Sequence, residues 1–188
     1  KYASMRNATV TAIAPTGSIS IIAGCSSGIE PLFAIAFMRN VLDGSRLFEI
    51  NPLFEKVAKA RGFYSVDLFR RIAKTGSVQG LKEVPADVRR LFTTALDIAP
   101  EWHVQMQAAF QRFTDNAVSK TVNLKKTAKP SEIERIYKLA WKLKCKGITV
   151  YRYGSKPHQV LYVGKPGYLS ASSEYAGGCM TGTCPFPG

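Results

Sequence analysis

The chain contains no long hydrophobic run, and this absence removes several classes of protein. No stretch approaches the ~18 consecutive apolar residues that a transmembrane helix requires. No basic segment precedes an apolar one in the manner of a secretory signal peptide. We therefore expect a cytoplasmic protein that does not enter a membrane.

Cysteine and histidine are also scarce. The four cysteines, at positions 25, 145, 179 and 184, are too few and too unevenly spaced for the disulfide framework of a small secreted domain. Two histidines leave little room for general-base histidine chemistry. No Ser/His/Asp set, H-E-x-x-H motif or clustered pair of carboxylates is visible, so the sequence shows no hydrolytic machinery. We also expect no metal site.

The composition that remains is that of a folded domain. Hydrophobic residues make up 46% of the 188 residues and aromatic residues 11%, which excludes a disordered chain. Lys and Arg number 26 against 13 acidic residues, and the formal charge of +13 predicts affinity for phosphates, nucleic acid or other anionic surfaces. The basic residues are scattered, which is more typical of a solvated surface than of a nucleic-acid-binding arm. Because the first residue, Lys1, is not Met, we expect a fragment of a longer protein.

Local patterns predict alternating strands and helices. A buried strand is expected at residues 8–13, followed by a short helix that starts near Ile19. Later strands are expected at residues 117–124 and 148–153, and the helix between them makes a βαβ unit with parallel strands. Apolar spacing and flanking Pro or Gly residues predict further helices at residues 53–61, 66–75, 86–92 and 101–113.

Two of the predicted helices carry more detailed signals. The helix at residues 101–113 has an apolar stripe that predicts its buried face, and His103 beside the stripe is expected at the surface or at a cap. In the helix of the βαβ unit, Ser131 and Glu134 form a capping box, and Gly147 is expected as the stop. The stripe of the first helix consists of Trp102, Met106, Ala109, Phe110 and Phe113. The buried side of the second is predicted to be Ile133, Ile136, Tyr137, Ala140 and Leu143.

The loop at residues 15–20, in the stretch APTGSIS, joins a predicted strand to a predicted helix. Ligands gather at such positions in α/β proteins. Free backbone N–H groups at a helix start attract a phosphate, Gly17 allows the backbone to approach closely, and Thr and Ser hydroxyls add donors. The loop is therefore either a phosphate cradle or a capped turn, since neither a Walker lysine nor G-x-G-x-x-G is present to decide.

The segment after Gly154 is rich in Gly, Ser and Pro and shows no helical period, and we expect a tail that is mobile at least beyond Tyr168. Near its end, Cys179 and Cys184 form a C-x-x-x-x-C pair among glycines, which allow the short ring to close in disulfide geometry. A dithiol on a flexible stem is suited to redox transfer. Half of a zinc site and two incidental thiols are the alternatives.

Three stretches of the sequence are informative together. They read RNATVTAIAPTGSISIIAGCSSGIEPLFAIAFMRNVLDG, DIAPEWHVQMQAAFQRFTDNAVSKTVNL and KGITVYRYGS. Over residues 6–161, in this order, the sequence resembles the C-terminal part of class II, adenosylcobalamin-dependent ribonucleotide reductase, and the P-T-G-S segment is specific within it. One departure is the pair Lys125-Lys126, where family members commonly have a Pro-containing N-L-P segment.

The resemblance implies an α/β fold, namely the C-terminal part of the ten-stranded α/β barrel of ribonucleotide reductases. Residues 1–161 would belong to the barrel and residues 162–188 to a flexible redox tail. Cys179 and Cys184 match the family's tail cysteines, which reduce the active-site disulfide after each turnover and are themselves reduced by thioredoxin or a similar protein. The residues that match the family's loop for the substrate phosphates are Pro15, Thr16, Gly17, Ser18, Ile19 and Ser20.

The activity implied is the reduction of a ribonucleoside di- or triphosphate to its 2′-deoxy form. In the family, homolysis of the Co–C bond of adenosylcobalamin leads to a thiyl radical that takes the 3′ hydrogen, the 2′ hydroxyl leaves as water, and a cysteine pair supplies the electrons. Those cysteines lie upstream, so this chain alone is expected to be inactive without the missing N-terminal part, and the intact enzyme could form a homodimer. Cys25 and Cys145 are expected to pack rather than to react.

Two other functions are compatible with the residues. The first is a basic nucleic-acid-binding module that uses Tyr151, Arg152 and Tyr153 as a stacking surface, and it predicts steeply salt-dependent binding to any single strand. The second is a non-catalytic fragment that completes a barrel with a separate N-terminal chain. Selective binding of nucleotide phosphates at the 15–20 loop would favour the reductase over the nucleic-acid-binding module, and co-expression with an upstream partner would test the second alternative.

Overall fold

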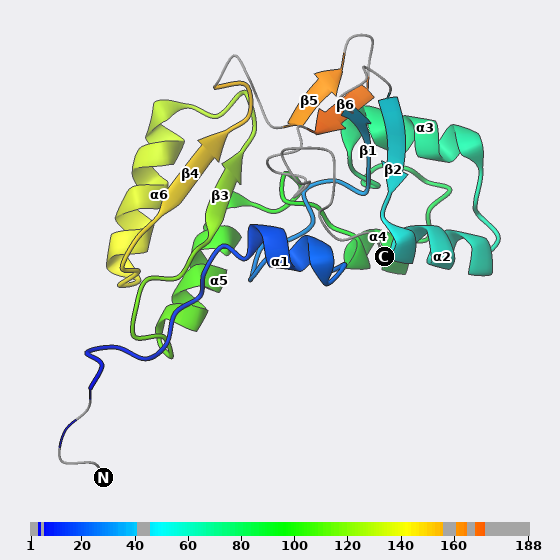
Figure 1. Cartoon of the computed structure of the whole chain (residues 1–188). Coiled ribbons are helices and arrows are strands. Elements are labelled where there is room, and N and C mark those ends of the chain that lie inside the picture. Colours follow the sequence, from blue (N-terminus) through cyan, green and yellow to red (C-terminus); the bar gives the residue numbers. More distant parts are fainter. Residues whose placement is uncertain (1–3, 5, 41–45, 156–160, 165–167, 172–188) are drawn as a thin grey trace. The chain divides into compact units, whose positions relative to one another are not determined.

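The computed structural model describes residues 4, 6–40, 46–155, 161–164 and 168–171. These residues fall into two compact units, whose elements are labelled in Figure 1. The first unit contains the described residues up to Thr16, together with residues 27–30 and 99–155. The second contains residues 17–26, residues 31–98 and the described residues beyond 160. Both units combine helices with strands, which confirms the α/β class.

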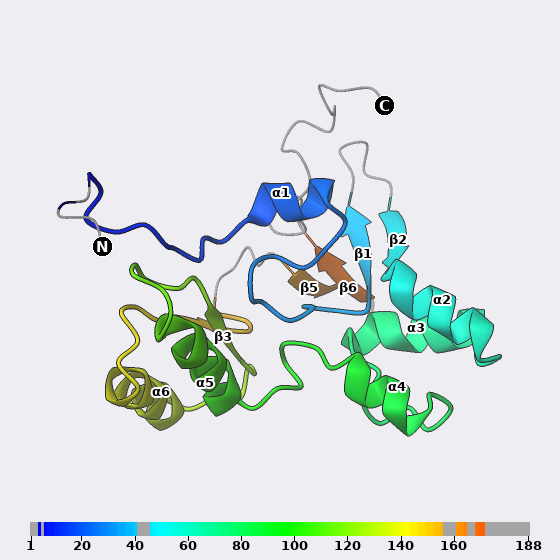
Figure 2. The same cartoon turned by 90° about the horizontal axis from the view of Figure 1, so that it is seen from below.

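The first unit is built on the predicted βαβ motif. Strand β3 (Thr121–Leu124) leads through helix α6 (Pro130–Lys142) to strand β4 (Thr149–Arg152). The two strands pair in parallel, as predicted. Helix α5 (Pro100–Gln111) lies beside α6, as Figure 2 shows. The core between these elements consists of Val104, Val122, Leu124, Ile136 and Ala140.

Residues 8–13 do not form the predicted buried strand. Residues 8–12 are exposed, and Val10 retains 60% of its accessible surface. Ile13 alone makes a strand-like pairing, a parallel bridge to Val118 next to β3. The prediction was wrong because a β-branched run is buried only where neighbours cover it, and within the described residues this segment has a hydrogen-bonded neighbour along one edge only.

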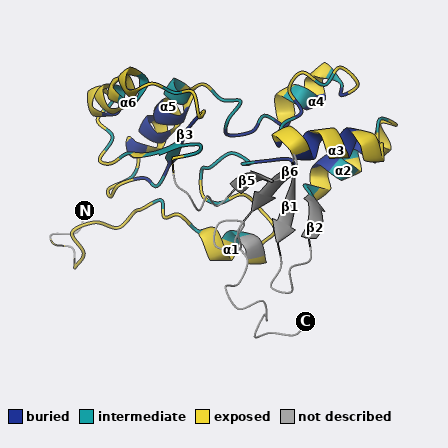
Figure 3. Cartoon of the chain, turned by 90° about the horizontal axis from the view of Figure 1, so that it is seen from above, coloured by how far each residue is buried: buried dark blue, intermediate teal, exposed yellow. Residues whose placement is uncertain are grey.

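The buried face of α5 is not the predicted apolar stripe. Figure 3 shows the helix as buried along one side, and that side carries His103, Val104, Gln107, Ala108 and Gln111. The stripe, with its aromatic residues, is exposed, and Phe113 is 87% accessible. The inward polar side chains are tolerated because they form hydrogen bonds, as when Gln107 Nε2 donates to the carbonyl oxygens of Val118 at 3.2 Å and Gly147 at 2.6 Å.

Helix α6 begins differently from the prediction. Pro130 occupies its first turn, where the fixed φ of proline suits a helix start. Glu132 therefore becomes the capping residue, and its Oε2 accepts from the backbone N–H of Lys129 at 2.9 Å. Ser131 and Glu134, the predicted capping box, lie inside the helix instead.

The end of α6 also differs from the prediction. The helix stops at Lys142, and Lys144 rather than Gly147 takes the left-handed conformation that follows, with φ +60°. Ile136 and Ala140 are buried as predicted, whereas Tyr137 is 50% exposed because it points off the edge of the buried face. Ile133 and Leu143 are half-buried.

The described part of the second unit combines four helices with a four-stranded sheet. The strand order in the sheet is β2-β1-β6-β5, in which β1 pairs with β2 antiparallel and with β6 parallel. Helix α1, predicted near Ile19, is confirmed, as are the helices predicted at residues 53–61 and 66–75. The elements are α1 (Gly17–Ile22), β1 (Ala36–Asn40), β2 (Arg46–Ile50), α2 (Pro52–Ala60), α3 (Val66–Thr75), α4 (Ala86–Leu91), β5 (Leu161–Gly164) and β6 (Tyr168–Ala171).

Phe54 lies at the centre of the second unit's core and is fully buried. Its ring makes edge-to-face contacts with Phe92 and Phe69, with centroid distances of 5.1 and 5.7 Å. The side chain of Asn51 caps α2 by accepting from the backbone N–H groups of its first turn. Gly76 ends α3 with φ +74°, as its position in the sequence predicts.

Two described stretches beyond residue 160 form a hairpin, in which strands β5 and β6 pair antiparallel. The expectation of a flexible tail over residues 162–188 stays a prediction. A glycine-rich and serine-rich composition did not exclude strands here, because β6 adds to an edge that β1 already offers. Cys179 and Cys184 lie outside the described residues, and the predicted boundary at residue 161 stays a prediction.

Candidate functional site

The 15–20 loop contains a strained residue. Thr16 has φ +53°, the left-handed region that β-branched residues avoid at a cost of about 1–2 kcal/mol. Within the described residues, Thr16 and Lys144 are the two non-glycine residues with positive φ. Strain of this kind persists where the surroundings enforce it and is concentrated at binding and catalytic sites. The conformation of Thr16 therefore marks the loop as a candidate site.

Helix α1 starts directly after the strained residue. Its first turn contains no acidic side chain that would repel an anion. Gly17 and Ser18 are exposed, and Ile19 keeps 63% of its surface accessible. A Cβ atom placed on Gly17 would meet no atom within 4 Å, so the space beside the helix start is open. Ser20 Oγ donates to the carbonyl oxygen of Gly17 at 2.8 Å and stabilises this short helix.

Residues 27–30, which we call the 27–30 turn, contact the chain just before the strained residue. Ser27 Oγ donates to the carbonyl oxygen of Pro15 at 2.8 Å. The backbone N–H of Glu30 donates to the carbonyl oxygen of Ser27 at 2.9 Å and closes the turn. Gly28 has φ +51°, and a Cβ there would lie 3.2 Å from the carbonyl oxygen of Ala14. Glycine thus permits both the turn and its close approach to residue 14.

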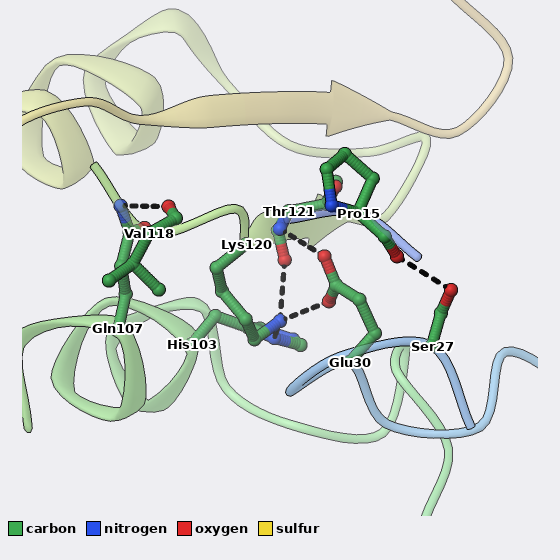
Figure 4. A network of polar contacts seen from close by, with 8 residues as sticks. All are labelled: Pro15, Ser27, Glu30, His103, Gln107, Val118, Lys120 and Thr121. Carbon is green, nitrogen blue, oxygen red and sulfur yellow. Dashed lines mark hydrogen bonds and ion pairs between the residues drawn. The ribbon is translucent and has the colours of Figure 1, made fainter. Parts of the chain in front are cut away.

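An ion pair joins the 27–30 turn to Lys120, the residue before β3, and is drawn in Figure 4. Lys120, whose side chain is 2% exposed, places its Nζ 2.6 Å from Glu30 Oε2. The same Nζ lies 2.9 Å from His103 Nδ1 and 2.8 Å from the carbonyl oxygen of Thr121. Glu30 Oε1 accepts from the backbone N–H of Thr121 at 2.5 Å. Two oxygen acceptors and one ring nitrogen of His103 thus surround the Lys120 ammonium, which carries three N–H donors.

The electrostatics of this network assign its protonation states. Burial lowers the pKa of the Lys120 ammonium, and the adjacent Glu30 carboxylate opposes that shift. Because the Glu30 carboxylate and the Thr121 carbonyl oxygen both accept from Nζ, the charged form of Lys120 fits the geometry. Nδ1 of His103 then acts as an acceptor, which places the proton of the neutral ring on Nε2.

Sequence reasoning missed this network. His103 was expected at the surface or at a cap, but it is 1% exposed, and neither Glu30 nor Lys120 was singled out. One signal was available: Lys120 is a cation within the apolar strand candidate AVSKTVNL, and a charge in a buried strand requires a partner. The identity of that partner, 90 residues away, cannot be read from local spacing.

The two cysteines in the described part differ from each other. Cys25 follows the short helix α1 and is exposed among the described residues, contrary to the expectation that it packs. Cys145 is half-buried against the core of the first unit, as expected, and burial raises the pKa of its thiol. Both are free thiols. Within the described ranges, no group of three His, Cys, Asp or Glu side chains could hold a metal ion.

Comparison with known proteins identifies the family. The family described as "Ribonucleotide reductase, barrel domain" matches residues 1–151, which include the 15–20 loop, the 27–30 turn and Lys120. This chain belongs to the ribonucleotide reductase barrel family. The expectation of a reductase barrel fold is thereby confirmed. No helix in the described part of this reductase segment is both long and apolar enough to cross a membrane.

Several ribonucleotide reductases are similar over most of the chain. The vitamin B12-dependent ribonucleoside-diphosphate reductase of Mycobacterium tuberculosis (strain H37Rv) is 53% identical over 183 residues, covering 96% of this chain and 26% of that protein. The protein of the same name from Thermoplasma acidophilum is 48% identical over 199 residues, with the same coverage of 96% and 26%. The chain thus spans about a quarter of the length of these curated relatives.

A solved structure supports the same fold. The alpha subunit of the class Id ribonucleotide reductase from Actinobacillus ureae matches with a TM-score of 0.67 and 26% sequence identity. The match covers 79% of this chain and 27% of that subunit.

Proposed function

We propose that this chain is the C-terminal part of an adenosylcobalamin-dependent ribonucleotide reductase and that its 15–20 loop binds the phosphates of the substrate. The substrate class is a ribonucleoside diphosphate, because the relatives that are 53% and 48% identical are named ribonucleoside-diphosphate reductases. The observation that carries the loop's role is the strained Thr16, which directly precedes a helix start free of acidic groups.

The loop's chemistry follows from its backbone. The first-turn N–H groups of α1 have no intrahelical acceptor and attract an anion. Gly17 carries no side chain, so phosphate oxygens can approach these groups. The hydroxyls of Thr16 and Ser18 add donors. The loop holds and orients the nucleotide, so that less entropy is lost in the chemical step.

The cofactor would act elsewhere in the protein. When bound, adenosylcobalamin supplies the radical that starts ribose reduction. Among the described residues, His103 is 1% exposed and its Nδ1 lies 2.9 Å from Lys120 Nζ, so this histidine is not available as a cobalt ligand. We therefore assign no described residue to the cofactor.

The second part of the proposal concerns the tail dithiol. Cys179 and Cys184 would exchange with the active-site disulfide, giving two electrons and two protons to it and forming a disulfide between themselves. A thioredoxin-like dithiol would then reduce that disulfide.

The remaining reductase polypeptide, which would contain the other catalytic cysteines, is the obligatory partner. We also propose a homodimer and a cytoplasmic location.

The substitution Gly17→Val in the full reductase tests the loop's role. The valine side chain enters open space, so we expect the fold to persist while the affinity for a ribonucleoside diphosphate falls at least 10-fold, about 1.4 kcal/mol. Gly17→Ala is the graded control and should have an intermediate effect. Unchanged affinity in Gly17→Val would contradict a phosphate-binding loop.

The structure does not favour the nucleic-acid-binding alternative. Arg152, the centre of the suggested stacking surface, donates to the carbonyl oxygen of Lys126 at 3.0 Å. Tyr151 and Tyr153 are half-buried. These side chains are used within the fold, so we make no proposal of single-strand binding.

A further inference from the structure

The conformation of the 15–20 loop requires an anchor that the loop itself does not supply. Pro15 has no backbone N–H, so its carbonyl oxygen is its single backbone hydrogen-bonding group. That oxygen accepts from Ser27 Oγ at 2.8 Å. Thr16, the next residue, is the strained one. The hydrogen bond from Ser27 therefore lies directly before Thr16, whose backbone adopts a left-handed conformation that threonine disfavours.

The 27–30 turn is a rigid support for that contact. Its backbone closes on itself through the hydrogen bond from Glu30 N–H to the Ser27 carbonyl oxygen. Gly28 lets the turn lie against the chain at Ala14. Both oxygens of the Glu30 carboxylate are occupied by donors from β3 and the residue before it. A displacement of the turn would break this set of contacts.

We propose that the 27–30 turn is a positioning element for substrate phosphates, in which Ser27 holds the Pro15 carbonyl and thereby fixes the conformation of Thr16. This inference rests on the proposed phosphate-binding role of the 15–20 loop. Ser27 is a positioning residue and touches no substrate atom. Glu30 holds Ser27 in place, because its carboxylate joins the 27–30 turn to the Thr121 N–H and to the buried Lys120 ammonium.

The substitution Ser27→Ala in the full reductase tests the inference. Loss of one hydrogen bond is expected to raise KM for a ribonucleoside diphosphate about fivefold and leave kcat within about twofold. The inhibition constant of inorganic pyrophosphate should rise by a similar factor, since that probe reports on the phosphate subsite alone. Ser27→Thr keeps the hydroxyl and should restore both values.

The adjacent Ser26→Ala is the matched control. Ser26 is exposed, and the structure gives it no side-chain hydrogen bond among the described residues, so both constants should stay unchanged. If Ser27→Ala leaves KM and pyrophosphate inhibition unchanged while Gly17→Val abolishes binding, the positioning role is overturned and the proposed function stands. If neither substitution affects binding, the proposed function itself fails. A fall in kcat alone, or failure of Ser27→Thr to restore KM, would also overturn the positioning role.

Discussion

The ion pair between Glu30 and Lys120 gives a quantitative prediction. The substitution Glu30→Gln keeps an oxygen that can accept from Thr121 but leaves the Lys120 ammonium, whose side chain is 2% exposed, without its anion. Removing one partner of a buried pair costs about 3–5 kcal/mol. The Glu30 side chain is 25% exposed, so water reaches it and the lower figure of about 3 kcal/mol applies.

The assay is amide hydrogen exchange in the full reductase. A loss of about 3 kcal/mol corresponds to a roughly 100-fold faster exchange through local opening in the peptide that covers β3. Lys120→Met should produce a similar loss. The double variant Glu30→Gln, Lys120→Met buries no unpaired charge, so its loss should be smaller than the sum of the two single losses. The ion pair would not be the contact that holds the 27–30 turn if the double variant lost the sum of the two single losses. Unchanged exchange in Glu30→Gln would refute it as well.

Three further predictions concern other parts of the chain. Thr16→Gly should relieve strain and stabilise the fold by up to about 1 kcal/mol, measured by urea unfolding, while nucleotide affinity falls because the loop is less ordered. Hydrogen bonds from the backbone at residues 10–11 lower the pKa of Asp115, so its stabilising contribution is present above the ordinary value of 3.8 and is lost as pH falls through the lower folded-state pKa. The protection factors of these amides, which are corrected for the intrinsic pH dependence of exchange, should fall over that pH range and be low at every pH in Asp115→Ala. Phe54→Ala should cost about 3–5 kcal/mol in unfolding experiments, whereas Leu53→Ala, at a position 67% exposed, should cost less than about 0.5 kcal/mol; equal losses would contradict the packing described.

Local signals predicted the elements whose causes are local. Gly76 ends α3 because it takes φ +74°, and proline marks the starts of α2, α5 and α6. The parallel βαβ motif followed from two β-branched runs and the helix between them. The 15–20 loop was singled out from its glycine and hydroxyl residues at a predicted strand-to-helix junction, and its phosphate-binding role stays a prediction. The sequence did not reveal that Thr16, rather than a glycine, takes the positive φ.

Predictions failed where tertiary contacts decide the outcome. Helix α5 has apolar residues on one face and polar residues with His103 and Gln107 on another, and spacing alone favours burial of the apolar face. The structure buries the polar face because acceptors and donors for those side chains come from distant segments, such as Lys120 and the carbonyl oxygen of Gly147. Pairings of this kind are not encoded in any local pattern.

The contact that joins Glu30 to Lys120 is ionic and not apolar, and this difference indicates what the contact does. A buried ion pair adds little net stability over apolar residues of similar volume, so stability alone does not explain it. An apolar contact would allow the 27–30 turn to slide along β3, whereas two carboxylate oxygens bound to the Thr121 N–H and the Lys120 ammonium allow one register. We therefore expect the double variant Glu30→Gln, Lys120→Met to recover part of the lost stability without recovering nucleotide affinity. Recovery of both would show that the network serves folding and does not position the loop.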